Sequence, residues 1–412
     1  MAEFKPVLLS LQSSFTPSLA LEVCSRQPQI VLAELMHLVQ ILPHGLTLHR
    51  IIVQADGRTH DVVIGPELPK DHVSQKYTNS IVGRYSNRIP VGTHILERHG
   101  IKSEFVAQAN GDEAELSHLS SPTTDHAIFR LISPDGNQGF PGKLILEALV
   151  AIIGPGKQER KYRTTTDIPQ AVGPEYDLGS IVLTYRAKLD EEKKSDRIAE
   201  LGPDALPTGA FLLAKDHPSH AHSAKRIGDL FPEKGYDDFY LLQNPGSSQF
   251  PTRLPLSSFN SKLDLIKDII QPSNDEQGKP TRGNRPEPVV ELSSEKSGIK
   301  LVFDTNRTSQ PSILQPRTRI TFETERGVMF YSNTFGNPAS GARKKIHGGS
   351  GISGHGDSYG SATAVFLEFH EPLAAFLDPK NKNGDDTLIT NDELYHNYVR
   401  CDVRFKEVDV AE

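Results

Sequence analysis

Apolar and polar residues alternate over short segments along most of the chain, as in strands that bury one face. Val, Ile, Leu, Phe and Tyr are frequent in these segments, and Gly, Pro, Asn or Asp stand at their ends. Clear examples are residues 49–57, 142–156, 179–189 and 398–408. The chain also has 32 glycines and 29 prolines, which suit many reverse turns. The pattern therefore predicts a mostly β fold.

A few segments depart from the strand pattern. Helical periodicity is convincing over residues 261–271, where leucines and isoleucines recur on one face. Residues 189–209 and 271–298 are interpreted as insertions or linkers, and the second is charged, rich in Pro and poor in apolar residues. Such a composition predicts a solvated loop. Residues 1–30 do not follow the strand pattern, so we treat them as an N-terminal extension of a β domain over residues 31–412.

Charge and length narrow the class of protein. The chain has 412 residues, with 45 lysines and arginines against 52 acidic residues, which gives a net charge of -7. A negative chain has no long-range attraction for nucleic acid or for an anionic membrane. A neutral or small polar ligand fits this balance better. The length allows one large β domain or two fused ones.

The cysteine content and the N-terminal residues indicate which cellular compartment to expect. Cys24 and Cys401 lie far apart in the sequence, so neither a disulfide framework nor a cysteine zinc site is predicted. Glu3 and the short apolar run that follows it argue against a secretory signal, and no later apolar run is long enough to span a bilayer. We expect a soluble, cytoplasmic protein with reduced thiols.

Three segments resemble known kinds of ligand site but lack the residues or the neighbouring elements that such sites need. The glycine-rich residues 347–360 precede an apolar strand, whereas a phosphate loop opens a helix, so a flexible hairpin is predicted. Residues 378–393 resemble a calcium loop, but Pro379 falls at the first ligand and Thr390 at the bidentate glutamate. The histidines of residues 217–222 have Ser, Ala and Lys as neighbours, which favours a surface loop over a metal site.

Five separated segments share their letters and their order with one known family. Together they resemble the aldose 1-epimerase (galactose mutarotase) family, particularly its fungal members. The likeness runs from about Leu38 to the end of the chain, with gaps of low similarity. The segments are VGRYSNRIPVGTH (residues 82–94), SPDGNQGFPGKL (133–144), LPTGAF (206–211), GYDDFYLL (235–242) and VFLEFHEP (365–372), the last matching the family's Leu-Glu-x-Gln strand.

The resemblance implies a fold and an activity. The fold would be a large antiparallel β-sandwich with the site on its concave face. The activity would be interconversion of the α and β anomers of a hexose such as galactose or glucose. This reaction moves a proton from the anomeric hydroxyl and adds one to the ring oxygen, so one base and one acid suffice without metal or cofactor. The partner would be a small-molecule hexose, bound by a monomer or weak dimer.

The resemblance also implies functions for individual residues. Glu368 would be the general base, Asp237 would hold hydroxyls, and Asn87 and Arg88 would reach sugar hydroxyls. Arg84 and Tyr85, which precede the Asn-Arg pair, would serve structure instead.

The same residues also have ordinary structural explanations. Without the resemblance, Asn87 and Arg88 could be solvated side chains of a surface strand. Glu368 could equally be a satisfied structural carboxylate, because acidic groups in apolar strands are usually paired. As a base, however, Glu368 would gain from its apolar neighbours, which desolvate the carboxylate and raise its pKa toward neutrality.

Two expected histidine segments are not found. His118 has the right order for the first histidine, but it is too close to Asp135 and lacks the flanking glycines. His347 has the right neighbours but lies near the wrong end of the chain. The segment of the proton-donating histidine is absent between residues 181 and 209. An incomplete gene model or a degenerate paralogue would explain both departures.

These departures leave alternatives open. The chain could be a catalytically weakened or inactive carbohydrate-binding paralogue that keeps the sugar contacts. It could also be a hexose-6-phosphate 1-epimerase, which would need Arg or Lys clustered around the site.

Overall fold

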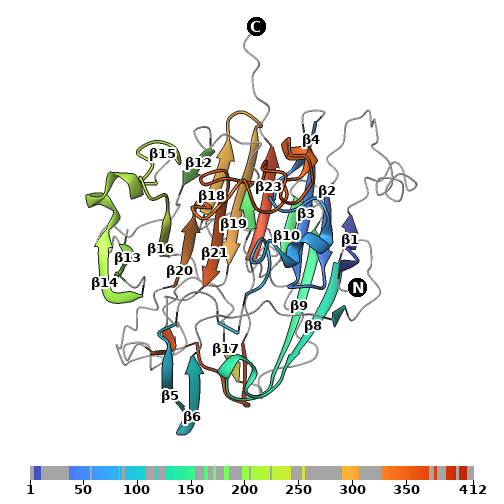
Figure 1. The fold of residues 1–412 in the computed structure, drawn as a ribbon. Helices are drawn as coiled ribbons and strands as arrows, with labels where there is room; N and C mark the ends of the chain where they lie inside the picture. The colour runs from blue at the N-terminus through green and yellow to red at the C-terminus, as the bar shows by residue number, and fades with distance from the viewer. Residues whose placement is uncertain are drawn as a thin grey trace, which may run out of the picture.

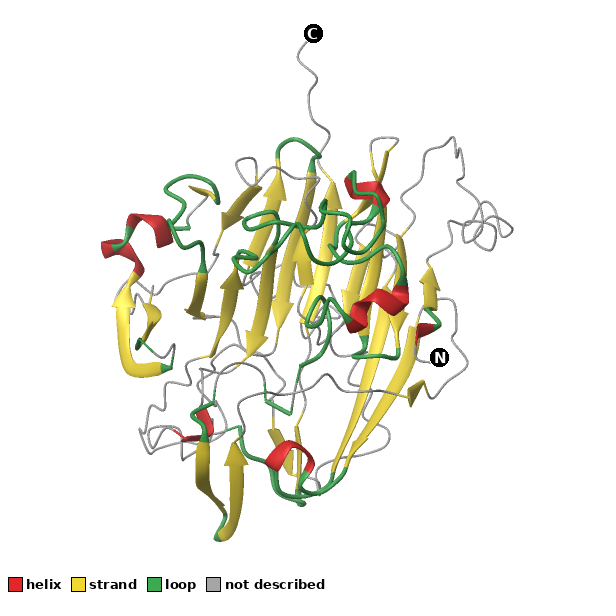
Figure 2. Cartoon of the chain, in the orientation of Figure 1, coloured by secondary structure: helices red, strands yellow, loops and turns green. Residues whose placement is uncertain are grey.

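In the structure, a computed structural model, the regular secondary structure of the described residues consists of antiparallel β-strands and short 3-10 turns. Figure 1 shows these strands as layered sheets, and the short 3-10 turns lie in the connections between them (red in Figure 2). The described residues are 4–10, 37–55, 58–82, 84–85, 89–107, 117–118, 126–153, 162–165, 170–172, 181–184, 197–203, 206–222, 225–242, 253–255, 290–305, 326–370, 375–377, 387–395 and 399–405.

Among the described residues, the largest sheet has nine strands, all of whose neighbouring pairs are antiparallel. Its order is β15 (Lys225–Arg226), β12 (Ile181–Thr184), β18 (Val290–Ser294), β19 (Ile299–Thr305), β23 (Val399–Phe405), β10 (Tyr162–Thr165), β9 (Leu144–Ile153), β8 (His126–Ser133) and β7 (Ser117–His118).

Two further sheets complete the sandwich. The six-stranded sheet has the order β11 (Gln170–Val172), β21 (Val365–His370), β20 (Arg326–Tyr331), β16 (Asp237–Leu242), β13 (Arg197–Leu201) and β14 (Pro207–Leu213). The four-stranded sheet is formed by β1 (Val7–Ser10), β2 (His37–Leu42), β3 (Thr47–Ala55) and β4 (Arg58–Asp61).

Smaller elements lie at the periphery. The pair β5–β6 projects as a hairpin at the bottom of the view in Figure 1. The two-stranded elements are β5 (Gly92–Arg98) with β6 (Ile101–Ala107), and β17 (Arg253–Pro255) with β22 (Glu393–Tyr395). The 3-10 turns are η3 (Pro69–Val73), η4 (Asn137–Gly139), η6 (Ala214–Asp216), η7 (Pro218–His220), η9 (Lys345–His347) and η10 (Ala375–Leu377).

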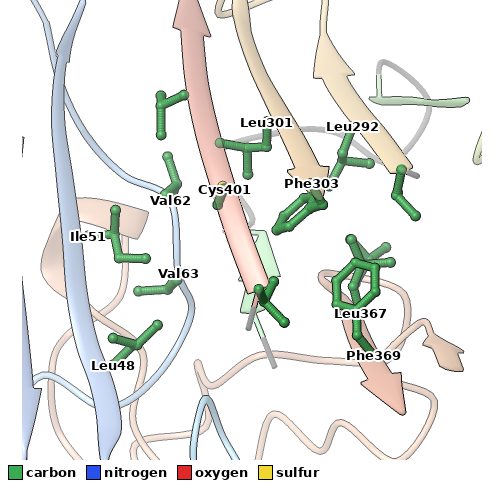
Figure 3. Packing of buried hydrophobic residues seen from close by; sticks show 14 of the residues in the cluster. Leu48, Ile51, Val62, Val63, Leu292, Leu301, Phe303, Leu367, Phe369 and Cys401 are labelled. Carbon is green, nitrogen blue, oxygen red and sulfur yellow. The ribbon is translucent and has the colours of Figure 1, made fainter. Parts of the chain in front are cut away.

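One large hydrophobic cluster joins the three main sheets. Side chains from β3, β19, β23 and β21 point into a common region in Figure 3. Phe303 and Leu367 have no solvent exposure, and Cys401 is 3% exposed. Alternation along each strand places such residues on the inner face. The predicted all-β antiparallel sandwich is therefore confirmed.

Several local predictions need correction. Residues 189–209 were expected to be a linker, yet β13 and the start of β14 fall within them and add two strands to the six-stranded sheet. The predicted loop 271–298 ends earlier than expected, because Val290–Ser294 form β18 with four buried residues of five. Residues 271–289, the predicted helix 261–271 and Cys24 lie outside the described residues.

The first residues contribute to the domain. Val7–Ser10 pair with Leu38–Ile41 of β2, and Leu9 is fully buried in the main cluster. Part of the segment treated as an N-terminal extension is therefore the edge strand of the four-stranded sheet. In the described part of the chain, no helix has the length and apolar character needed to cross a membrane.

The segment between β20 and β21 is held by a buried lysine. Lys344 Nζ donates to the Asp61 carboxylate at 2.8 Å and to the backbone carbonyls of His49 and Val63 at 2.6 and 2.8 Å. Neither the Lys344 nor the Asp61 side chain is exposed. Burial lowers the pKa of Lys344 to about 8, although the negative charge of Asp61 opposes this shift.

The glycine-rich residues 347–360 are packed against this network. His347 Nε2 donates to the Asp61 carbonyl at 2.8 Å, and its Nδ1 accepts from the Tyr359 hydroxyl at 2.8 Å. Both residues are at most 5% exposed. The prediction of a flexible hairpin is therefore wrong, because its two ends carry buried, hydrogen-bonded side chains.

A second ion pair attaches the β5–β6 hairpin to the C-terminal part of the chain. Arg98 Nε and Nη2 donate to the two carboxylate oxygens of Glu393 at 2.8 and 2.5 Å. The backbone amide of Thr390 also donates to this carboxylate at 3.0 Å. These hydrogen bonds, led by those from Arg98, lower the pKa of Glu393 to about 2.

Replacing Lys344 should strongly destabilise the fold. Lys344→Ala leaves the Asp61 carboxylate buried without its ammonium partner, and removing one partner of a buried pair costs about 3–5 kcal/mol. Urea denaturation should show this loss as a lower free energy of unfolding. The exposed neighbour is the control, because Lys345→Ala should change stability by less than about 0.5 kcal/mol. Equal stabilities of the two variants would contradict the structural importance of Lys344.

The Arg98–Glu393 pair should make stability depend on acid. The folded protein holds the Glu393 pKa below its ordinary value of 4.5, so the unfolded chain binds the proton more readily. The stabilisation is complete above about pH 5 and is lost as the pH falls toward about 2. Urea midpoints at neutral pH and at about pH 3 should therefore differ more for the wild type than for Glu393→Gln. Glu97→Gln, whose side chain is 56% exposed, should keep the wild-type pH dependence.

Candidate functional site

The register of three neighbouring strands gathers polar residues on one face of the six-stranded sheet. Asp237 of β16 lies opposite Tyr331 of β20, which lies opposite Phe366 of β21. Two residues further along β21, Glu368 lies opposite Met329 of β20. Residues that are directly opposite share a face, as do residues two apart on one strand. Asp237 and Glu368 therefore lie on the same face.

The other face of these strands belongs to the core. Leu367 and Phe369, the neighbours of Glu368 on β21, are 0% and 8% exposed and point into the main cluster in Figure 3. Glu368 must project from the opposite side of the sheet, because successive side chains alternate. It is also the one half-buried residue of β21, whose other five residues are buried. The carboxylate thus lies among apolar side chains while keeping access to solvent.

The backbone spacing suits a small ligand shared by the two carboxylates. Asp237 and Glu368 are two strands and two residues apart, which corresponds to about 12 Å between α-carbons. Two acidic side chains can bridge this span with one hexose-sized molecule between them. The structure therefore places two of the residues predicted for the site on one face of the same sheet.

Asp238 is adjacent in sequence but belongs to the opposite face. Burial raises the pKa of Asp238 to about 6, and the negative charge of Asp237 adds to this shift. Its Oδ2 is 3.9 Å from His220 Nδ1, in a cluster that faces the core. Of the two consecutive aspartates, Asp237 therefore faces the candidate site.

The histidines of residues 217–222 form part of this core-side cluster. His220 Nδ1 and His222 Nε2 lie 2.6 and 3.1 Å from the Tyr240 hydroxyl, and His222 is 2% exposed. Burial lowers their pKa values to about 4 and about 3 respectively. The predicted surface loop is therefore wrong at His222. Among the described residues, no group of three or more His, Cys, Asp or Glu could hold a metal ion.

Arg84 fixes the turn that follows β8. Its guanidinium donates to the carbonyls of Ser133, Pro134, Pro141 and Gly142 at 2.6–3.2 Å and to the Ser133 hydroxyl at 3.0 Å. The two sequence motifs at residues 82–94 and 133–144 are thus held together by one side chain. This is the structural function predicted for Arg84.

The predicted Asn-Arg pair follows a short described segment that ends at Tyr85. Asn87 and Arg88 lie outside the described residues, and the nearest described positions are Tyr85 and Ile89. Tyr85 and Ile89 pack in a small hydrophobic cluster with Phe376, and the Tyr85 and Phe376 rings are 4.9 Å apart. Tyr85 therefore has a packing function, as expected.

His118 is not brought into the sheet that carries the carboxylates. It lies on β7, the edge strand of the nine-stranded sheet, opposite Phe129 of β8. Glu368 and Asp237 belong to the six-stranded sheet. Another histidine, His370, was missed by the sequence reasoning, although it is two residues after Glu368 and strand alternation would have placed both on one face.

This face combines groups that can bind hydroxyls with groups that can move protons. Aspartate accepts hydrogen bonds from hydroxyls, while glutamate and histidine are common general bases and acids. The chemistry that the face supports is proton transfer on a polar, uncharged ligand.

Comparison with known proteins gives matches to one family. The sequence model of the aldose 1-epimerase family matches residues 29–310, a range that contains Asn87, Arg88 and Asp237 and ends before Glu368. Aldose 1-epimerase of Escherichia coli is 24% identical over 277 residues, which cover 60% of this chain and 79% of that protein. Galactose mutarotase of Bos taurus is 30% identical over 231 residues, which cover 52% and 67% respectively.

A solved structure shares the fold. The crystal structure of the aldose epimerase homologue from C. elegans matches with a TM-score of 0.57 and 15% sequence identity. The match covers 98% of this chain and all of that one. The likeness therefore extends over the whole sandwich.

Proposed function

The chain belongs to the aldose 1-epimerase family, and on this basis we propose that it interconverts the α and β anomers of a free hexose such as galactose or glucose. The observation that carries the proposal is the common face of Asp237 and Glu368. A half-buried carboxylate among apolar neighbours can act as a base, and a second acidic group within the reach of one hexose can hold its hydroxyls.

The proposed reaction opens and closes the sugar ring. Glu368 takes the proton of the anomeric hydroxyl while a general acid protonates the ring oxygen, so the bond between the anomeric carbon and the ring oxygen breaks. The aldehyde rotates, and closure on its other side gives the second anomer. Asp237 accepts hydrogen bonds from other hydroxyls, and Asn87 and Arg88 extend these contacts.

A second candidate is a carbohydrate-binding protein without catalysis. It is favoured by the position of His118, which lies on the nine-stranded sheet and not on the six-stranded sheet that carries Glu368. Titration calorimetry with galactose separates the two, because binding without any acceleration of mutarotation supports the second candidate. Competition between glucose 6-phosphate and glucose tests the phosphorylated substrate in the same assay.

Removing the charge of Glu368 should abolish most activity. Glu368→Gln keeps the side-chain shape but cannot accept the proton, so kcat should fall by about two to four powers of ten. Polarimetry with freshly dissolved α-galactose measures this rate. Glu295→Gln is the control, because that side chain is 63% exposed in the turn that follows β18. A folded wild type that gives no acceleration above buffer would refute the proposed activity.

Replacing each of the two consecutive aspartates should have different effects on substrate binding. Asp237→Asn weakens the acceptors that face the sugar, so KM should rise roughly tenfold, as expected for the loss of a hydrogen bond to a charged group. Asp238→Asn changes the core-facing side chain and should leave KM within about twofold. Saturation curves by polarimetry provide both values. A larger effect at Asp238 than at Asp237 would show that the faces are assigned wrongly.

A further inference from the structure

His370 lies beside Glu368 on the same strand and face. The two residues are two positions apart on β21, which places their α-carbons roughly 7 Å apart. Register pairs His370 with Gly327 of β20, and Gly327 with Leu241 of β16. The imidazole therefore belongs to the row next to that of Glu368, on the side away from the row of Asp237.

The His370 ring is held by an aromatic stack that a glycine permits. The rings of Phe239 and His370 are 5.0 Å apart with an angle of 25° between their planes. Phe239 comes from β16, so its ring must extend across β20 to reach β21. A β-carbon on Gly327 would be 2.5 Å from the Phe239 ring and 2.2 Å from the Tyr240 carbonyl. The missing side chain thus gives Phe239 the space to contact His370.

This arrangement suits a positioned proton-transfer group. Phe239 is fully buried and His370 is 8% exposed, so neither ring has the freedom of a surface side chain. Stacking covers the flat side of the imidazole, while the two nitrogens lie at its edge. Asp237 and Tyr331 are the other ionisable residues at register positions of this face on β16 and β20, and they share the row on the other side of Glu368. His370 is the ionisable neighbour of Glu368 on the same strand and the same face.

We propose that His370 is the second proton-transfer group of the site, acting as the general acid for Glu368. The inference rests on the proposed function. As Glu368 removes the proton from the anomeric hydroxyl, the electron pair of the breaking ring bond passes to the ring oxygen, which takes a proton from the imidazolium. In closure, the neutral imidazole removes this proton as the ring oxygen attacks the aldehyde, and protonated Glu368 returns its proton to the anomeric oxygen. Both groups end in their starting states.

The test is the pH–rate profile of His370→Gln, measured by polarimetry with α-galactose. Glutamine keeps a hydrogen-bonding side chain of similar size but cannot donate a proton as an acid. We expect kcat to fall by about two to four powers of ten with little change in KM. The profile should change from a bell to a single limb, because the limb contributed by the imidazole disappears. A purely structural function would lower stability without changing the shape of the profile.

His355→Gln is the matched control, because that imidazole is 57% exposed in the segment between β20 and β21. It should keep the wild-type profile. His370→Asn provides a second, smaller replacement if the glutamine variant does not fold, and it should show the same loss of a limb. Circular dichroism establishes that each variant is folded before its rate is measured.

The outcomes separate this inference from the proposed function. An active wild type together with a folded His370 variant that keeps both kcat and the bell-shaped profile would overturn the function of His370 alone. A folded wild type without activity would overturn the proposed function and this inference together. Both are supported if the wild-type protein has a bell-shaped pH–rate profile that His370→Gln reduces to one limb and His355→Gln leaves unchanged.

Discussion

A buried lysine ammonium links the parts of the chain that carry the site. Lys344 can remain charged without solvent because the Asp61 carboxylate and the carbonyls of His49 and Val63 accept its three protons. Lys344 belongs to the segment between β20 and β21, and Asp61 is the last residue of β4. The ion pair therefore attaches the strands on either side of this segment to the four-stranded sheet. Arg50 also contacts Asp61 at 3.3 Å, so the Asp61 carboxylate forms ion pairs with two positively charged side chains.

The same packing that buries the core determines where the reactive groups point. Leu367 and Phe369 fill the inner face of β21, and each such side chain contributes about 1.5–3 kcal/mol when fully buried. A shift of the register by one residue would turn Glu368 into the core and Leu367 toward the site. The hydrophobic core thus excludes the alternative registers. Glu368 and His370 need no loop to orient them, because the sheet already does so.

Sequence reasoning was sufficient for local features and insufficient for long-range ones. Alternation and turn residues identified the β class, and an apolar run identified the strand containing Glu368. The turn fixed by Arg84 lies where its motifs indicated. It did not place β13 and β18, because short strands flanked by charged residues resemble loops until a partner strand is known. Lys344 stands in an Arg-Lys-Lys run that is typical of a surface, and its partner Asp61 is 283 residues away. The burial of His222 also depends on a partner from another element, because its Nε2 lies 3.1 Å from the hydroxyl of Tyr240 on β16.

Because strand register and not loops positions the site, its side chains can change while the backbone stays in place. At 15% identity the sandwich is still shared with the C. elegans homologue, so most side chains can change while the sheets remain. Position 370 lies on the outer face of β21 whatever residue occupies it, because the core residues Leu367 and Phe369 set the register. One substitution there can therefore place a proton donor next to Glu368 without any movement of the backbone. A sheet face of this kind can lose a histidine from one strand and gain one on another while keeping its base.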